Sequence, residues 1–217
     1  MVTVGFETIA QLAMATATLD TLGNRRQPVL DDADFWLHAL GAAKAAQLLA
    51  DSSPVVADSA VCFTGGLLHD VGKYVLALAL GKEYGPVASS AKEEEVALHK
   101  VESRVLGTTH ASVGAWLMTQ WGLPPLVVAA IEYQDHPDRY EGPNKAAVAA
   151  ISLCSDLARE CGLGYAGDHQ PPQYEPEGLC LLGIDKDTVH EVREHLADMR
   201  QEARAALNLL RCAEESG

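Results

Sequence analysis

Residues 65–73 read Gly-Gly-Leu-Leu-His-Asp-Val-Gly-Lys and place a histidine beside an aspartate after an apolar run. Burying an unpaired polar or charged group costs free energy, so His69 and Asp70 need partners elsewhere in the chain. If the segment is one helix, Lys73 lies four residues after His69 on the same face. That face then carries an imidazole, a carboxylate and an ammonium group. The alternative is a histidine at a helix end with an ordinary acidic neighbour, because a lone His-Asp pair often arises by chance.

The composition limits the classes of protein to which the chain can belong. The chain has 217 residues, of which 48% are hydrophobic, enough for one large domain or two small ones. Its net charge of −14 argues against a general nucleic-acid or anionic-membrane binder, since such proteins present basic patches. We therefore expect neither nucleic acid nor membrane as a partner. The same charge disfavours an anionic substrate unless a metal or a local basic group offsets it.

Cysteine usage indicates the cellular compartment. The five cysteines are scattered without a CxxC spacing, which is typical of reduced thiols in a cytoplasmic protein. The first 20 residues lack the basic region of a signal peptide, and no apolar run reaches the ~20 residues of a membrane span. The predicted location is cytoplasmic.

The chain reads as helical nearly throughout, because Ala-rich and Leu-rich segments are divided by Gly and Pro without period-2 strands. The predicted fold class is all-α, a compact multi-helix bundle. Residues 164–185, rich in Pro and Gly at their start, are expected to form a long surface loop. Helices are predicted over residues 4–22, 33–51, 56–80, 93–106, 109–121, 124–134, 144–161 and 186–212.

The predicted helix 186–212 is amphipathic, with apolar residues at alternating three- and four-residue spacings that form a narrow seam. The seam either docks on the domain's own core or serves as a dimer or partner surface. Its members are Val189, Val192, Leu196, Met199, Ala203, Ala206 and Leu210.

Several other histidines and aspartates fall in or beside apolar helical segments. One such residue would be a satisfied polar group in a core. Several on separate helices of one small domain indicate convergence on a metal, and mixed His/Asp sets suit Fe, Mn, Zn or Mg. They are His38, His110, Asp135, His136 and Asp156. By contrast, His99 lies in a charged segment and is expected to be exposed.

These motifs resemble the HD superfamily of metal-dependent phosphohydrolases, and more closely its HDOD branch, the output domains of bacterial signalling proteins. The resemblance covers about Val4 to Leu163 and implies an HD-like helical bundle. HDOD proteins usually carry a further helical region before this point, so we expect residues 1–217 to be a single HDOD-like domain that lacks the usual N-terminal part. The matching segments are FWLHALGAAKAAQLLA (35–50), AVCFTGGLLHDVGKYVLA (60–77), ESRVLGTTHASVGAWLMTQWGLPPLVVAAIEY (102–133) and ISLCSDLA (151–158).

The resemblance also implies roles for single residues. The primary metal ligands would be His38, His69, Asp70 and Asp156. His110 would bind the second metal of dinuclear relatives. Those relatives often have two adjacent histidines where this chain has Gln134 and Asp135, with His136 one residue later. Asp135 or His136 would then have to supply the missing ligand. Glu102 also matches an acidic position of relatives, or is a solvated helix charge.

Two functions follow from the resemblance. The first is a bacterial signalling domain that holds one Fe, Mn or Zn ion and acts through a protein partner, self-association or a phosphorylated small molecule. The alternative is a metal-dependent phosphohydrolase acting on a nucleotide-like phosphomonoester or phosphodiester. In that case Asp70 and Lys73 would be catalytic, with Lys73 stabilising negative charge or protonating a leaving oxygen. The altered second-metal motif favours the first function.

Overall fold

The computed structural model describes the backbone of residues 29–167 and 176–214, and their side chains except those of 176–177 and 202–214. All regular elements in these ranges are α-helices or short 3-10 helices, which confirms the predicted all-α class. The helix predicted over residues 4–22 lies outside the described residues. In the described ranges, no helix combines the length and apolar character that a membrane crossing requires.

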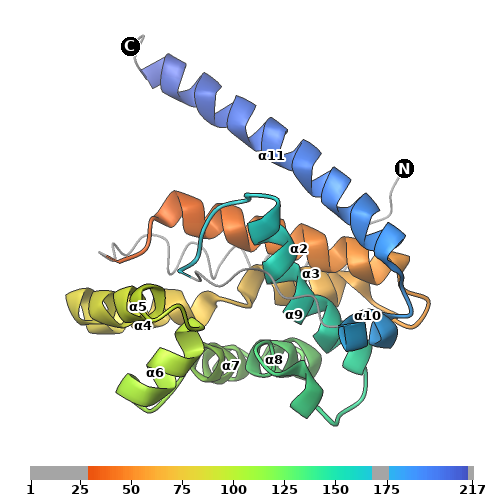
Figure 1. Cartoon of the computed structure of the whole chain (residues 1–217), viewed down its shortest axis with the longest axis horizontal. Coiled ribbons are helices and arrows are strands. Elements are labelled where there is room, and N and C mark those ends of the chain that lie inside the picture. The colour runs from red at the N-terminus through yellow and green to blue at the C-terminus, as the bar shows by residue number, and fades with distance from the viewer. Residues whose placement is uncertain (1–28, 168–175, 215–217) are drawn as a thin grey trace.

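The upper layer of the bundle consists of α2 (Asp32–Ser52) and α3 (Ser59–Leu68), and α9 (Lys145–Glu160) runs from this layer towards the lower one (Figure 1). These helices approach closely because their contacting faces carry small side chains. A Cβ on Gly66 of α3 would lie 2.7 Å from the carbonyl oxygen of Ala42. Ala42 and Ala43 of α2, which meet Gly66, are fully buried, as are Ala45 and Ala46 of the same helix.

The lower layer consists of α7 (His110–Gln120) and α8 (Pro125–Glu132), and α4 (Val71–Leu80) packs on α7. The backbones of α4 and α7 approach closely at Gly72. A Cβ on Gly72 would lie 1.9 Å from the carbonyl oxygen of His110, so only glycine allows this approach. The start of α7 is thereby held against the start of α4.

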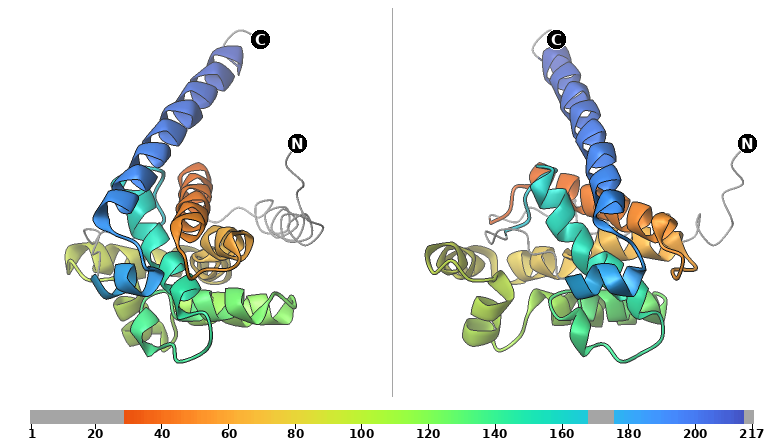
Figure 2. Two further views of the ribbon diagram at one scale, coloured as in Figure 1. Left: turned by 90° about the vertical axis from the view of Figure 1, so that its right-hand side faces the viewer. Right: turned by 45° about the vertical axis from the view of Figure 1, so that its right-hand side comes forward.

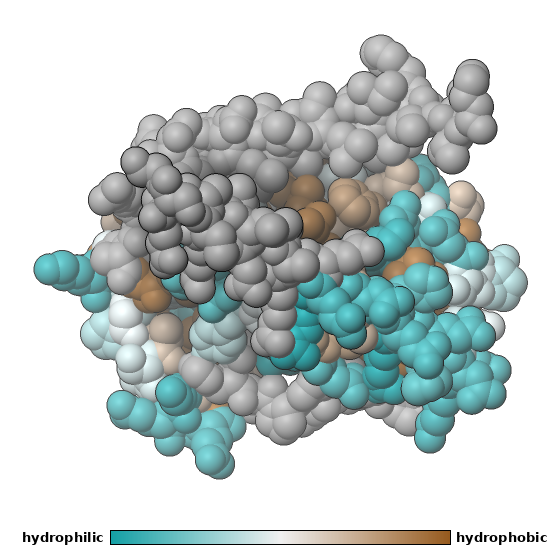
Figure 3. Space-filling model, turned by 90° about the horizontal axis from the view of Figure 1, so that it is seen from above, coloured by the Kyte–Doolittle hydropathy of each residue, from teal (hydrophilic) through white to brown (hydrophobic). Residues whose placement is uncertain are grey.

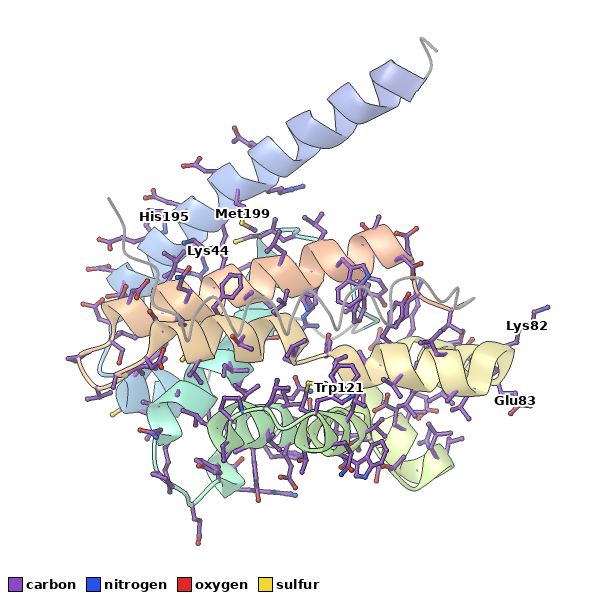
Figure 4. The ribbon with its side chains drawn as sticks, turned by 180° about the vertical axis from the view of Figure 1, so that it is seen from behind. Lys44, Lys82, Glu83, Trp121, His195 and Met199 are labelled. Atoms are coloured by element: carbon purple, nitrogen blue, oxygen red, sulfur yellow. The ribbon has the colours of Figure 1, made fainter. Side chains whose placement is uncertain are left out.

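A smaller unit packs at one end of the bundle. It consists of the 3-10 helix η1 (Gly81–Glu83), α5 (Tyr84–Glu93) and α6 (Leu98–Leu106). Figure 4 shows Lys82 and Glu83 at its outer tip, away from the core. This unit has its own apolar cluster, which includes the buried Tyr84 and Val101.

The last helix, α11 (Lys186–Glu214), begins against α2 and continues beyond the bundle (Figure 2). Val189, Val192 and Leu196 are buried in the main core, and Met199 packs against it between α11 and α2 (Figure 4). This confirms docking on the domain's own core for the first half of the predicted seam. The side chains of Ala203, Ala206 and Leu210 lie outside the described ones, so a partner role for that half stays a prediction.

The opposite side of this part of α11 is charged. Figure 3 shows hydrophilic side chains gathered over the end of the molecule at which α11 begins. The exposed residues on α11 there include Asp187, His190, Glu194, His195 and Asp198. This face of the helix is therefore solvated.

Several helix ends have local causes. The backbone N–H of Thr188 donates to Asp185 Oδ1 over 2.9 Å, which caps α11. Thr109 caps α7 in the same way, and Gly122 follows that helix with φ +71°. Pro125 is the first residue of α8, where its missing N–H costs no hydrogen bond.

The single helix predicted over residues 56–80 is wrong in one respect, because the chain breaks at His69 and Asp70 into α3 and α4. Two side-chain hydrogen bonds satisfy backbone carbonyls at the break. The Nδ1 atom of His69 lies 2.7 Å from the carbonyl oxygen of Gly66, and Gln134 Nε2 donates to the carbonyl oxygen of His69 over 2.9 Å. Lys73 consequently meets Asp70 rather than sharing a face with His69.

Two further segments differ from the predictions. The helix predicted over 93–106 begins only at Leu98, because Glu95 has φ +54° and interrupts the helical path after α5. Within 164–185, where a surface loop is predicted, α10 (Pro176–Leu182) is helical. It is anchored because Leu182 is buried in the main core and its carbonyl accepts a hydrogen bond from Ser53 Oγ over 2.6 Å.

Candidate metal centre

The buried triad of His38, His69 and Asp70 lies at the break between α3 and α4, facing α2. One ligand atom from each residue lies within 4.8 Å of the others. Asp70 Oδ2 is 3.2 Å from His69 Nε2 and 3.7 Å from His38 Nε2. The three residues are at most 2% exposed. Imidazole and carboxylate together suit a transition metal, so the triad can hold one.

The hydrogen bonding of His69 prepares it for ligation. A carbonyl oxygen only accepts, so the contact with Gly66 requires that Nδ1 of His69 carry a proton. In the neutral ring, Nε2 is then an unprotonated acceptor. This atom is buried and has no hydrogen-bond partner among the residues that the structure describes. A metal-binding histidine characteristically donates from its other ring nitrogen to a carbonyl or carboxylate. The arrangement therefore fits a cation at Nε2.

Lys73 supplies a positive charge inside the site. Its Nζ lies 2.8 Å from Asp70 Oδ2, and Lys73 is 1% exposed. Burial alone raises the pKa of Asp70, but the electrostatic attraction of the neighbouring His69 and Lys73 outweighs burial and holds that pKa well below its usual range. Asp70 is therefore ionised, as a metal ligand must be.

Asp156 lies outside the buried triad. Its carboxylate forms an ion pair with Arg159 on the next turn of α9. Its neighbour Ser155 instead reaches the triad, with Oγ 3.3 Å from His38 Nε2. Ligation by Asp156 stays a prediction.

His110 opens α7 beside the buried triad, with Nε2 3.8 Å from Asp70 Oδ1. Its Nδ1 lies 2.6 Å from Glu102 Oε2, which also accepts the backbone N–H of His110 over 2.8 Å. Burial lowers the pKa of His110, but the charge of Glu102 outweighs burial and raises it to about 9. His110 is thus a cation at neutral pH in the metal-free protein, and a metal at Nε2 must displace a proton.

Glu102 is fully buried and is not a solvated helix charge. Its second oxygen accepts a hydrogen bond from the buried Tyr84 hydroxyl. Burial raises the pKa of Glu102, but the charge of His110 and the hydrogen bonds together lower it below its usual value. Glu102 therefore orients His110. The sequence signal for Glu102 is its match to an acidic position of relatives. No sequence signal indicates Tyr84, which lies 18 residues before Glu102.

Residues 134–136 do not form a simple histidine pair. Gln134 is held by two hydrogen bonds. Its side chain donates to the backbone carbonyl of His69, and its own backbone carbonyl accepts from Ser152 Oγ over 2.6 Å. Asp135 Oδ2 lies 3.8 Å from His110 Nε2, so the structure brings this pair together. A second metal here stays a prediction.

The expectation that His99 is exposed is wrong. Its side chain is 16% exposed, and Nδ1 lies 3.1 Å from Asp135 Oδ1. The ring of His99 also meets the ring of His136 edge-on, with centroids 5.3 Å apart. The charged stretch around His99 concealed this contact, because the partners lie 36 and 37 residues later in the chain.

A family model described as "HDOD domain" matches residues 1–137 of the 217. The chain belongs to the HDOD family. The match includes three members of the site, His38, His69 and Asp70, and ends before α9. The HDOD match therefore covers the buried triad but not Asp156.

Solved structures support the HDOD assignment. An HDOD domain protein of unknown function from Geobacter sulfurreducens is 25% identical, with a TM-score of 0.77 over 94% of this chain and 71% of that chain. A protein from Marinobacter aquaeolei VT8, provisionally assigned to signal transduction, is 27% identical, with a TM-score of 0.79 over 95% of this chain and 46% of that chain. The MmoQ response regulator of Methylococcus capsulatus is 25% identical, with a TM-score of 0.59 over 76% of this chain and 62% of that chain.

Among curated proteins, an uncharacterized protein of Treponema pallidum is 29% identical over 107 residues. The alignment takes in 48% of this HDOD chain and 20% of that protein. The chain thus matches about a fifth of the length of this relative.

Proposed function

We propose that this HDOD chain is a regulatory signalling domain whose buried triad holds one divalent transition metal, Fe, Mn or Zn, and which acts through a signalling partner, self-association or a phosphorylated small molecule. The observation that carries the proposal is the burial of the site. His38, His69, Asp70, Lys73 and His110 are each at most 2% exposed. A phosphate ester cannot contact groups so enclosed without a rearrangement, whereas an ion that ties helices together needs no such access.

Each residue of the site would have a separate role. His38, His69 and Asp70 would hold the metal, with Asp156 as a further ligand. Such an ion supplies Lewis acidity and can lower the pKa of a bound water. Lys73 stays on Asp70 and offsets negative charge, and Glu102 fixes the ring of His110. Because the triad joins α2 to the α3–α4 break, the ion would stabilise the centre of the bundle.

The relatives support a signalling role. The Marinobacter protein is assigned provisionally to signal transduction, and MmoQ is called a response regulator. A protein from Shewanella amazonensis, assigned provisionally as a phosphohydrolase, is 23% identical with a TM-score of 0.68 and supports the fold alone. Hydrolysis is the alternative function, favoured by the Lys73–Asp70 contact at 2.8 Å.

We expect protein purified without chelator to contain about one transition metal per chain, since the triad forms one compact ligand set. The His69→Ala, Asp70→Ala double variant and the isosteric Asp70→Asn variant should lose it. For the wild type, free metal at about 100 times its Kd should add about 2.7 kcal/mol of stability, or roughly 5–10 °C in Tm. Elemental analysis and thermal unfolding measure both quantities.

The control for this prediction is a His190→Ala, Asp198→Ala variant, which removes the same two residue types from the exposed face of α11. It should keep both metal content and Tm. A well-folded wild type that takes up no metal after incubation with Fe, Mn or Zn would refute the metal site.

We further expect little or no turnover of cyclic dinucleotides and nucleoside monophosphates with added Mn, Fe or Mg. Enclosure of the site and the net charge of −14 both oppose an anionic substrate. Phosphate release by the wild type is compared with that of Asp70→Asn and the His69→Ala, Asp70→Ala variant. Metal-dependent hydrolysis that these variants abolish would replace the regulatory function with the hydrolytic one.

A further inference from the structure

The outer triad of His99, Asp135 and His136 lies beside the buried triad and has the same residue types. His99 comes from α6, and the other two residues come from the turn after α8. Its two imidazole rings have centroids 5.3 Å apart, and the rings of the buried triad have the same separation. In each triad the aspartate contacts a ring nitrogen, but not the same one: Asp135 lies 3.1 Å from His99 Nδ1, and Asp70 lies 3.2 Å from His69 Nε2. Two histidines and one carboxylate thus recur, with the carboxylate here on the nitrogen opposite Nε2.

The hydrogen bonding of His99 indicates which nitrogen is available. An ionised carboxylate only accepts, so the 3.1 Å contact with Asp135 Oδ1 requires a proton on Nδ1 of His99. In the neutral ring, Nε2 is then an unprotonated acceptor. It is buried and has no hydrogen-bond partner within the described part of the chain. A buried polar atom left in this state calls for a water or an ion.

We propose that His99 Nε2 and His136 form a second binding site for a divalent transition metal, with Asp135 holding His99 in the ligating tautomer. The arrangement of carboxylate, histidine and metal is a common second-shell device in metalloproteins. Imidazole ligands select Zn²⁺, Co²⁺, Ni²⁺ or Cu²⁺ over Mg²⁺ or Ca²⁺. Both rings are only partly buried, so water or an oxygen of a ligand completes the coordination.

Binding requires one adjustment. Among the described residues, only the buried triad already has three ligand atoms within 4.8 Å of one another. His136 begins the turn before the 3-10 helix η2 (Pro137–Arg139), and its side chain is half-buried. The site closes when that side chain turns towards His99 Nε2. The outer site does not depend on the function of the buried triad.

The test is Zn²⁺ titration of the full chain after chelator treatment, with competition against a chromophoric chelator and NMR of the histidine side chains. The wild type should bind Zn²⁺ at two sites. His99→Gln, His136→Gln should lose one site and keep the other, with unchanged thermal unfolding. Asp135→Asn leaves both ligands in place and should weaken this site by roughly 10–100-fold. His190→Gln, His195→Gln, which alters two exposed histidines, is the matched control and should bind as the wild type does.

The outcomes separate the two sites. Loss of all Zn²⁺ binding in Asp70→Asn alone, with none lost in His99→Gln, His136→Gln, overturns the outer site and leaves the proposed function intact. Loss confined to the His99 and His136 variants supports the outer site, even if the buried triad binds nothing. An equal loss in the His190 and His195 control overturns it, since adventitious surface histidines would then explain the binding.

Discussion

Replacing Lys73 with Met should destabilise the metal-free protein by about 3–5 kcal/mol, the usual result of removing one partner of a buried ion pair. Met nearly preserves the length of the side chain, so the change removes mainly the charge. The Asp70 carboxylate, 2% exposed, would then lose the ammonium that lies 2.8 Å from its Oδ2 atom. The ion pair therefore substitutes for part of the charge that a metal would bring.

Saturating metal should reduce this loss, because a cation bound by Asp70 compensates the same carboxylate. Urea unfolding of wild type and Lys73→Met, each with chelator and with Mn²⁺ or Zn²⁺, measures the difference. Lys82→Met is the control, since Lys82 is exposed at the outer tip of the molecule (Figure 4) and should change stability by no more than about 0.5 kcal/mol. An equal loss for Lys73→Met with and without bound metal would show that the ammonium and the metal do not share one role.

Gly72→Ala should destabilise the protein by about 3 kcal/mol or more, at the upper end of overpacking effects. The added Cβ would lie 1.9 Å from the carbonyl oxygen of His110 and 2.8 Å from the backbone nitrogen of Gly114. Both are backbone atoms, so no change of rotamer relieves the clash, and α4 must move away from α7. Because His110 opens α7, this movement also withdraws its Nε2 from Asp70.

The matched control is Gly85→Ala, a glycine within α5 whose added Cβ would meet nothing within 4 Å. It should be neutral or stabilise by about 0.5–1 kcal/mol, because alanine favours the helix. Chemical unfolding compares the two variants, and the histidine NMR signals of Gly72→Ala report the position of His110. A Gly72→Ala protein as stable as the wild type would contradict the backbone contact between α4 and α7.

Much of the fold follows from local signals in the sequence. Apolar segments without period-2 alternation predicted an all-α bundle, and the helices predicted to begin at residues 109 and 186 begin at His110 and Lys186. These predictions succeed because capping and helix periodicity depend on neighbours within one or two turns. The HDOD resemblance also rests on continuous segments, residues 35–50, 60–77, 102–133 and 151–158.

Other features depend on contacts between distant residues, which no local pattern encodes. The break at His69 is stabilised by Gln134, 65 residues later. A separation of 36 residues likewise hides the outer triad, since His99 looks solvated until Asp135 is placed beside it. In both cases the contact joins segments that lie far apart in the chain.

The sequence alone therefore determined the helical class, most helix limits and which residue types gather at the candidate site. The tertiary structure decided which residues surround these side chains and so whether each is charged. Glu102 has the sequence context of a solvated acid, yet its burial against His110 and Tyr84 makes it part of the site. Asp156 has the context of a ligand, yet Arg159 holds it and Ser155 faces His38. Burial and long-range pairing set the free energy of a charge, and both exist only once the helices have packed.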